Sequence, residues 1–396
     1  MKTVLTLKMI LSLALLLGLG GLMGRLPALA GESGDSDHER PLVKEGVLGT
    51  INVLREMDVR TWTNRVRATA GSPGFSLDWG GGPVDSTIDG GATSYLPKSS
   101  SDPWVVTYRL PGLRTVSSLV VQYADRGSVA PDTLGLEGSA DGGKTWRELF
   151  KRIHPRANGH VLKCFKPAKV NALRLTQEGG TPRTQEVFVY ADPEAPPLSL
   201  FGGPEGGAFS FLRSLWYSGR IKIVRSPSNA AWTSLPHGIP EKVLFMSGVA
   251  SAHDGGFGDA REKGKRLFLR LDLDKPYPMN YGLIGIPGGG ETDRPPRCRL
   301  GLHPAEFYTA HGNLDPSTLT GSSVKDLTGQ GWILQKSWDK DPAICKSFLL
   351  ARPGSYNQML VVWDAFAAYE NDRWSRLEMF GIETPDVGGA PEEPKK

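Results

Sequence analysis

Short runs in which apolar and polar side chains alternate are separated by glycine- and proline-rich segments along most of the chain. Residues 104–110, WVVTYRL, are typical, because almost every second side chain is large and apolar. This period of two predicts a β-strand with one buried face. Closely spaced glycine and proline between such runs favour an all-β sandwich over a helical or βαβ architecture. Strands are predicted at 104–110, 116–123, 134–139, 159–165, 172–176, 186–190, 266–273, 281–286, 305–309, 331–335, 347–350, 358–363 and 376–382.

The predicted strands fall into two halves on either side of a proline-rich segment. Residues 192–197, DPEAPP, hold three prolines, which stiffen the chain and exclude a helix. Strand order is similar in both halves, and each half closes with a strand that carries an acid, Glu186 or Glu378. We therefore predict two tandem β-sandwiches, at 49–191 and 198–384, related by duplication. The less regular segment 198–248 leaves open an extra subdomain.

The first thirty residues have the pattern of a cleavable signal peptide. Lys2 and Lys8 give a positive start, residues 9–23 are apolar, and Ala28-Leu29-Ala30 offers the small side chains that signal peptidase requires. The apolar run is about 15 residues long, shorter than the ~20 that span a bilayer, although an uncleaved anchor remains the alternative. The mature protein is thus expected outside the cytoplasm, either secreted, periplasmic or at the cell surface, with no transmembrane segment.

Removal of residues 1–30 changes the charge of the protein. The whole chain has 46 basic and 42 acidic residues, and the signal peptide contributes Lys2, Lys8, Arg25 and no acid. The mature chain therefore has 43 basic against 42 acidic side chains, a formal charge of +1. Nucleic acid and anionic membranes require a clustered positive field, so neither is an expected partner. Residues 31–48 and 385–396 are predicted to be a flexible leader and a disordered tail.

Three cysteines are few for an exported chain of this length, so stability must come from burial and not from a disulfide framework. Cys298 and Cys345 lie in the same half and form the expected pair. Cys164 lies in the predicted strand 159–165, where we expect it to be a small buried apolar residue.

Five segments of the first half occur in a characteristic order: 87–95 (TIDGGATSY), 104–110 (WVVTYRL), 138–146 (GSADGGKTW), 171–176 (NALRLT) and 185–190 (QEVFVY). They resemble the ordered motifs of the discoidin family, the coagulation factor 5/8 type C domains. Tyr95 and Tyr108 depart from the family pattern, in which Trp and Asp are common there. Residues 198–383 resemble the family more faintly and lack the DGG hairpin. The resemblance implies two galactose-binding-like jelly rolls whose loops, gathered at one end, bind sugars, phospholipid heads or proteins, and often one structural Ca²⁺.

The same hairpin also satisfies a phosphate-loop pattern. Residues 138–145 read G-x-x-x-x-G-K-T, which cradles phosphates only where a buried strand precedes it and a helix follows. Apolar residues 146, 149, 150 and 153 have helical spacing, so a helix is not excluded locally. The alternating approach strand, the turn-forming Asp-Gly-Gly and export to a compartment poor in ATP favour a hairpin instead.

A calcium site is expected in the first half, as the resemblance implies. Asp89 and the loop 90–94, which includes Thr93, offer a carboxylate and backbone carbonyls, and Glu186 can close the site, because Ca²⁺ needs several oxygens at once. The alternative is that Asp89 only caps a turn. Residues 254–259 are an acidic, glycine-rich segment that we expect to be an ordinary loop.

Aromatic side chains on loops are the candidates for ligand contact, because their ring faces stack on the apolar faces of sugars. Trp79 is the first candidate, since its glycine neighbours cannot shield it. The candidates of the second half are Trp216, Tyr217, Trp232 and His237, with Tyr369, Arg373 and Trp374 weaker. Trp104 and Trp146 lie in strand-like contexts and are assigned to the core.

Catalytic motifs are missing from the sequence. It contains no G-x-S-x-G, no H-E-x-x-H and no Cys-His cluster. Paired carboxylates for glycoside hydrolysis leave no local signature, so they stay possible. We therefore expect an exported, non-catalytic protein that binds extracellular or cell-surface carbohydrate. The alternatives are a glycan-active enzyme with its catalytic residues in the second half, and a structural or adhesion protein that binds other proteins.

Overall fold

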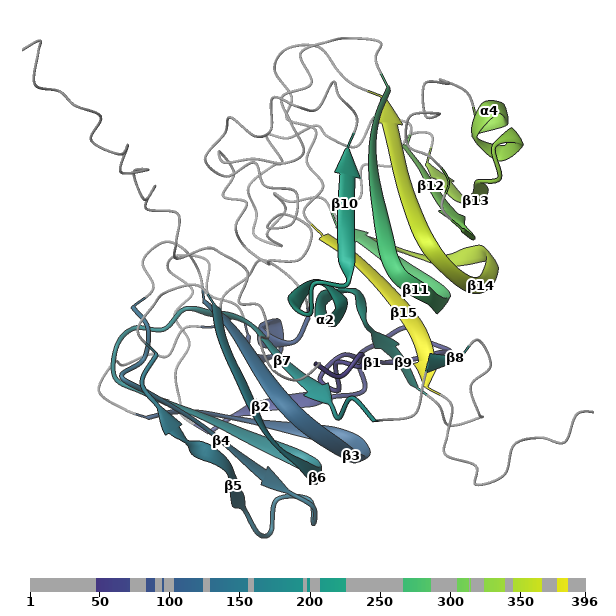
Figure 1. Ribbon diagram of the computed structural model, residues 1–396. Helices are drawn as coiled ribbons and strands as arrows, with labels where there is room; N and C mark the ends of the chain where they lie inside the picture. Colours follow the sequence, from purple (N-terminus) through teal and green to yellow (C-terminus); the bar gives the residue numbers. More distant parts are fainter. Residues whose placement is uncertain are drawn as a thin grey trace, which may run out of the picture. The chain divides into compact units, whose positions relative to one another are not determined.

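The structure is a computed structural model (Figure 1). It describes residues 48–71, 83–89, 95, 103–123, 129–155, 160–194, 198–199, 207–225, 266–285, 305–312, 314, 324–338, 345–364 and 376–383. The predicted signal peptide, nearly all of the leader and the tail lie outside the described residues. So do Trp79, Thr93, Trp232, His237, Cys298, the segment 254–259, Tyr369, Arg373 and Trp374.

The described part of the first half contains one antiparallel sheet, ordered β2-β3-β6-β4-β5, with β7 paired to β3. Its strands are β2 (Arg67–Ala70), β3 (Trp104–Tyr123), β4 (Thr133–Ser139), β5 (Arg147–Ile153), β6 (His160–Glu178) and β7 (Thr184–Ala191). The predicted strands 104–110 and 116–123 are the two ends of β3, and 159–165 and 172–176 are the two ends of β6. The pairing of β3 with β6 shifts register on either side of Arg114–Val116, near Pro111 and Pro167, because proline cannot donate to a ladder.

These irregularities divide the sheet into two layers. The front layer consists of β2, the first half of β3, the second half of β6, β4 and β5. The back layer consists of β7, the second half of β3 and the first half of β6. Apolar side chains of both layers pack into one core, where the Tyr123 hydroxyl of the back layer donates to Gln177 Oε1 of the front layer at 2.6 Å. The first half is therefore a jelly-roll sandwich, as predicted.

The second half repeats this strand order. Its strands are β10 (Ile221–Arg225), β11 (Arg266–Gly285), β12 (Ala305–Ala310), β13 (Ile333–Trp338), β14 (Cys345–Asp364) and β15 (Arg376–Glu383). They correspond in order to β2, β3, β4, β5, β6 and β7, and each pairing of the first half recurs. Both register shifts of β3 recur in β11, between Asp272 and Tyr277 and between Met279 and Tyr281. The predicted duplication is confirmed by this topology.

A turn against the front layer also repeats. Asn171 Oδ1 accepts from Gly142 N at 2.9 Å in the first sandwich, and Asn357 Oδ1 accepts from Gly312 N at 2.9 Å in the second. Both glycines have positive φ, +77° and +86°, a conformation that disfavours side chains with a Cβ. Equivalent residues thus hold equivalent turns, although their flanking sequences differ.

One detail of the predicted duplication is wrong. The first pairs after the second register shift are Ser118 with Tyr190 and Tyr281 with Phe380. When residues are counted back from these pairs along β7 and β15, Glu378 corresponds to Phe188 and not to Glu186. The two acids lie two residues apart in the common register, a difference that the sequence pattern of a short strand cannot reveal.

Short elements lie between or beside the long strands. They are β1 (Glu56–Asp58), the 3-10 turn η2 (Val84–Thr87), β8 (Leu198–Ser199), β9 (Gly207–Ser210), α2 (Leu212–Tyr217) and α4 (Val324–Gly329). β1 pairs with β9, and β9 pairs with β15, so a segment near the start of the chain completes the second sheet. The proposed boundaries at 49–191 and 198–384 remain predictions. Among the described helices, none is long and apolar enough to cross a membrane.

Two further expectations are settled by the fold. Residues 138–146 form the β4–β5 turn and the strand β5 follows, so the predicted hairpin is confirmed and the helix of a phosphate loop is absent from this segment. Cys164 is exposed, so its predicted burial is wrong. It lies at the register shift of β6, where the alternation of inward and outward side chains is interrupted.

Candidate functional site

Front-layer strands end together at one end of the first sandwich, and four connections begin or finish there. They are 71–103, 124–132, 154–159 and 179–183, and each starts or ends where front-layer strands end. We call this end the loop end. The first connection contains the predicted residues Trp79, Asp89 and Thr93, of which only Asp89 belongs to the described residues.

A double-glycine turn brings two of these connections into contact. Gly179 and Gly180 have φ of +72° and +64°. A Cβ on Gly179 would lie 1.9 Å from Asp132 Oδ2, and one on Gly180 would lie 2.3 Å from Ala130 O. Val129 and Thr181 exchange backbone hydrogen bonds of 3.1 and 3.2 Å across the same contact. Only glycine permits this approach, which places the Asp132 carboxylate directly beside the turn.

Charged and polar side chains lie around the double-glycine turn, and we call Asp132, Arg152, His154 and Glu178 the loop-end cluster. His154 Nδ1 lies 2.7 Å from the Asp132 backbone oxygen. Because a carbonyl oxygen only accepts, Nδ1 donates, and Nε2 of the neutral ring is left as an acceptor. Arg152 Nη1 donates to Glu178 Oε1 at 2.5 Å, and Thr133 Oγ1 donates to Glu178 Oε2 at 3.1 Å.

The cluster is open to solvent and charged. The side chains of Arg152 and Glu178 are 49% and 36% exposed, and Asp132 and His154 are exposed. The hydrogen bond from Arg152 is the largest cause that lowers the pKa of Glu178, and it outweighs desolvation, which acts in the opposite direction. The hydrogen bond from Thr133 makes a smaller contribution in the same direction as Arg152. The cluster therefore offers a carboxylate, a guanidinium and an imidazole acceptor on one surface, a set suited to a ligand with many hydroxyl groups.

The sequence reasoning missed all four residues of the loop-end cluster. Each lies at a strand end next to a turn signal, Pro131-Asp132, His154-Pro155 or Glu178-Gly179-Gly180. Turn signals locate the end of a strand, but they do not show which strand ends are neighbours. A search for charged residues next to such signals would have selected these positions among others.

Trp216 and Tyr217 are placed differently from the prediction. Both lie on α2 and are 2% and 0% exposed, with their ring centroids 4.9 Å apart. Burial raises the pKa of Tyr217 above its ordinary value. The expectation that these rings are open to a ligand is thereby corrected: α2 is buried on all sides, and its aromatic residues fill the core.

The two tryptophans assigned to the core have different outcomes. Trp104 is buried and lies in the main core, as predicted. Trp146 is half-buried and lies on the outer side of the front layer, so that assignment is wrong. Its ring lies 4.4 Å from the guanidinium carbon of Arg174, because the β4–β5 turn folds back over the sheet.

Two members of the predicted calcium set, Asp89 and Glu186, belong to the described residues. Asp89 is exposed, whereas Glu186 is buried near Tyr108, Tyr190 and Tyr217. Burial is the main cause that raises the pKa values of these three tyrosines, and the negative charge of Glu186 adds to it. Within the described residues, no group of three or more His, Cys, Asp or Glu could hold a metal ion. Thr93 lies outside the described residues, and the calcium site of Asp89, Thr93 and Glu186 stays a prediction.

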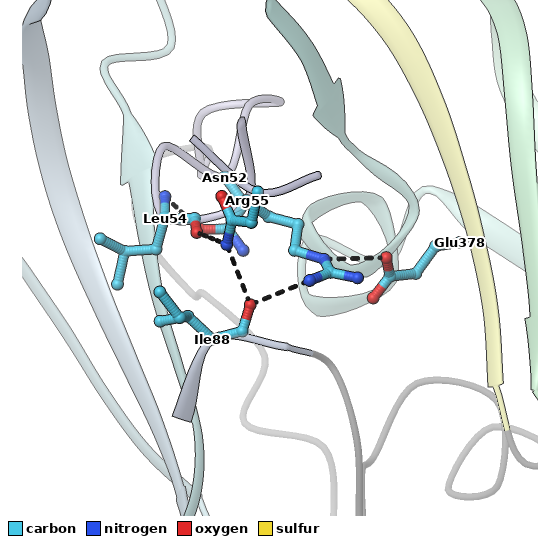
Figure 2. Close-up of polar contacts among 6 residues, drawn as sticks. Asn52, Leu54, Arg55, Ile88 and Glu378 are labelled. Carbon is cyan, nitrogen blue, oxygen red and sulfur yellow. Dashed lines mark hydrogen bonds and ion pairs between the residues drawn. The ribbon is translucent and has the colours of Figure 1, made fainter. Parts of the chain in front are cut away.

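A second polar cluster is buried between the two sandwiches (Figure 2). Arg55 Nε donates to Glu378 Oε2 at 3.3 Å, and Arg55 Nη1 donates to the Ile88 backbone oxygen at 3.1 Å. Arg55 is 7% exposed and Glu378 2%, so the pair is closed to solvent-borne ligands. Its role is structural: it connects β15 of the second sandwich to the segment before β1 and to the end of η2.

No protein-family model matches the chain, and no curated protein matches it in sequence. Among solved structures, the chain is similar to the family 32 carbohydrate-binding module of Clostridium perfringens NanJ in complex with galactose, with 21% identity over 32% of this chain and 93% of that one and a TM-score of 0.28. It is also similar to a fucolectin from striped bass (Morone saxatilis) serum, with 13% identity, 84% and 98% coverage and a TM-score of 0.27. A third neighbour is allantoicase, with 9% identity, 84% and 93% coverage and a TM-score of 0.37.

The first two neighbours are a carbohydrate-binding module and a lectin with the galactose-binding-like, discoidin-type fold. This is the family that the sequence motifs of the first half resemble. The jelly-roll assignment itself rests on the strand order and the register of this chain.

Proposed function

We propose that the protein is an exported, non-catalytic carbohydrate-binding protein and that the loop-end cluster contacts the sugar. The observation that carries this proposal is the exposed set of Asp132, Arg152, His154 and Glu178, held by strands that end together. Sites on strand ends are more rigid than sites on long loops, and rigidity reduces the entropy lost when a sugar binds. The resemblance to discoidin domains, whose loops bind sugars, supports the same location.

The chemistry of the cluster supports binding over hydrolysis. Glycoside hydrolysis needs one carboxylic acid with a raised pKa to protonate the leaving group. The pKa of Glu178 is lowered, chiefly by the hydrogen bond from Arg152, so Glu178 stays ionised and cannot act as that acid at neutral pH. An ionised carboxylate held by a guanidinium is suited instead to accept hydrogen bonds from sugar hydroxyls.

Export through the signal peptide and a calcium ion held by the loop of Asp89 and Thr93 belong to the same proposal. Asp89 supplies one carboxylate, and the glycine-rich loop that follows it supplies backbone carbonyls, the hard oxygen donors that Ca²⁺ prefers. The ion would then stabilise the connection that also contains Trp79.

A glycan array probed with the mature protein tests the proposal, once with calcium and once with EDTA. We expect the array to show binding to a subset of neutral glycans. The glycan bound most strongly is then titrated, and His154→Ala and Arg152→Gln should each weaken its affinity about tenfold or more. This is the loss expected when one hydrogen bond to a charged group or a polar acceptor is removed. His311→Ala and Arg352→Gln remove the same groups from exposed positions of the second sandwich and should leave affinity unchanged. Absence of binding to every glycan, or equal affinity in all four variants, contradicts the proposal.

A further inference from the structure

The outer faces of the two front layers, although built on the same strands, have opposite chemistry. In the second sandwich Phe268, Tyr308, Leu360 and Val362 form an apolar cluster that Leu327 of α4 and Trp332 complete. The strand registers identify the equivalent residues of the first sandwich. Val105 pairs with Thr176 as Phe268 pairs with Val362. Glu137 pairs with Arg174 as Tyr308 pairs with Leu360.

Polar residues therefore occupy three of these four positions in the first sandwich, the fourth being Val105. Thr176, Glu137 and Arg174 are each partly exposed, and Arg174 donates to Glu137 at 2.7 Å. The equivalent strands thus keep their positions, while one outer face is covered by Leu327 of α4 and Trp332 and the other carries charged side chains.

Two arginines lie directly opposite each other on this open face. Arg67 of β2 pairs in register with Arg109 of β3, and both are exposed. Like charges at directly paired positions destabilise a sheet. Among the described residues neither arginine forms an ion pair: Arg67 donates to the Asn64 backbone oxygen at 3.1 Å, and Arg109 to the Gly142 backbone oxygen at 2.7 Å. An anion between them would relieve the repulsion.

The β4–β5 turn fixes one side of this arginine pair. Its backbone holds Arg109, its Trp146 ring contacts Arg174, and Asn171 holds Gly142 in place. Asp141, the acid of the turn, is engaged by Ser139, Thr145 and the backbone N–H groups of residues 144 and 145. The acidic side chain of this turn is therefore committed to the turn itself.

We propose that the outer face of the first front layer binds an acidic glycan, with a sugar carboxylate between Arg67 and Arg109. This inference rests on the proposed carbohydrate function and adds a second surface and a substrate class to it. The planar guanidinium fork matches a carboxylate in two parallel hydrogen bonds. Thr69 and Thr107, which are cross-strand partners beside the arginines, offer hydroxyl groups to the neighbouring sugar.

Calorimetric titration with hexagalacturonate, and with its methyl ester as the uncharged control, tests this surface. Wild-type protein should bind the acid at least tenfold more tightly than the ester, and more weakly at 200 mM than at 50 mM NaCl. The double variant Arg67→Gln/Arg109→Gln should lose at least tenfold in affinity. Arg352→Gln, which removes the same charge from an exposed position of the second sandwich, should bind as wild type does.

The loop-end variant separates this inference from the proposed function. His154→Ala should retain hexagalacturonate binding while it loses neutral array glycans. The inference would be overturned if hexagalacturonate binding were lost in His154→Ala and kept in the double variant. It would also be overturned if the protein bound a sulfated heparin hexasaccharide and did not bind hexagalacturonate. Neutral glycans bound without any acidic glycan would refute the second surface and leave the loop-end proposal standing. Thermal unfolding of Arg67→Gln and Arg109→Gln, singly and together, checks that the variants stay folded.

Discussion

Asp141 organises the β4–β5 turn through its carboxylate. The oxygens of this single side chain accept from the backbone N–H groups of residues 144 and 145, from the Thr145 hydroxyl and from Ser139. Gly142 and Gly143 follow with positive φ, so the turn also needs the conformational freedom of glycine. These local requirements explain why S-x-D-G-G is readable as a hairpin from the sequence.

The carboxylate of Asp141 should make stability depend on pH. Hydrogen bonds from Thr145, backbone first, hold its pKa well below the ordinary value, so its contribution is present above about pH 4 and is lost as pH falls towards the folded-state pKa. Asp141→Asn should therefore be less stable than wild type at pH 7, and the difference should shrink as pH falls from 5 to 2. Urea unfolding at several pH values measures this. Lys144→Gln alters the same turn without removing the carboxylate, and a pH-independent difference for Asp141→Asn would contradict the prediction.

At the scale of elements, most long strands were predicted, whereas the short strands β2 and β10 and the short helices were not. The predicted strands coincide with described strands because alternation is a local property that each strand displays in full. Residues 212–217, LRSLWY, form α2, yet six residues that are all buried show no helical face. The long strands β3, β6, β11 and β14 were each predicted as two strands, because proline and glycine mark their bends in the same way as they mark turns.

The burial of α2 leads to a prediction about Trp216. Trp216→Ala should lower the free energy of unfolding by about 3–5 kcal/mol, the usual cost of removing a large aromatic side chain from a core. Glycan affinity of the protein that remains folded should not change. Denaturant unfolding and array binding provide the two measurements, with Trp146→Ala, a half-buried surface residue, expected to cost less. A stable Trp216→Ala variant that has lost glycan binding would show that the predicted ligand role was right after all.

The whole molecule is held together by an exchange between its halves. Segments 51–55 (INVLR) and 209–213 (FSFLR) occupy equivalent positions beside the last strands β7 and β15, and each reaches into the other half. Arg55 binds Glu378, and the guanidinium carbon of Arg213 lies 4.8 Å from the Phe188 ring centre. Glu378 and Phe188 are equivalent positions, so the two arginines make reciprocal contacts, one with a carboxylate and one with an aromatic face.

Removing only one member of the buried pair Arg55 and Glu378 should destabilise the protein more than replacing both members by apolar residues. Arg55→Met leaves a buried carboxylate without this partner and should destabilise the protein by about 3–5 kcal/mol, whereas Arg55→Met/Glu378→Leu should recover most of that loss. Urea unfolding of the single and double variants gives the coupling energy. The exposed pair Arg152–Glu178 serves as the control, with less than about 1 kcal/mol expected from Arg152→Gln. A double variant as unstable as the sum of its singles would mean that the two side chains act independently.

The candidate sites show the limit of prediction from sequence. Asp132 and His154 come from separate connections and Glu178 is the last residue of β6, so their proximity depends on the jelly-roll pairing of β4, β5 and β6. Arg67 and Arg109 are far apart in the chain and meet only through the β2–β3 register. No local pattern encodes such neighbours, because side-chain alternation reports one strand at a time.

The sequence by itself determined the all-β class, the positions of most of the longer strands, the hairpin at 138–146 and the repetition of one strand order. Each of these follows from side-chain period and turn chemistry, which act over a few residues. Tertiary structure alone decided that Trp216 and Tyr217 are buried, that Cys164 is exposed, that Glu378 matches Phe188, and that one front layer is covered while the other is open. These outcomes depend on which surfaces pack together, and packing is set by contacts between residues distant in the chain.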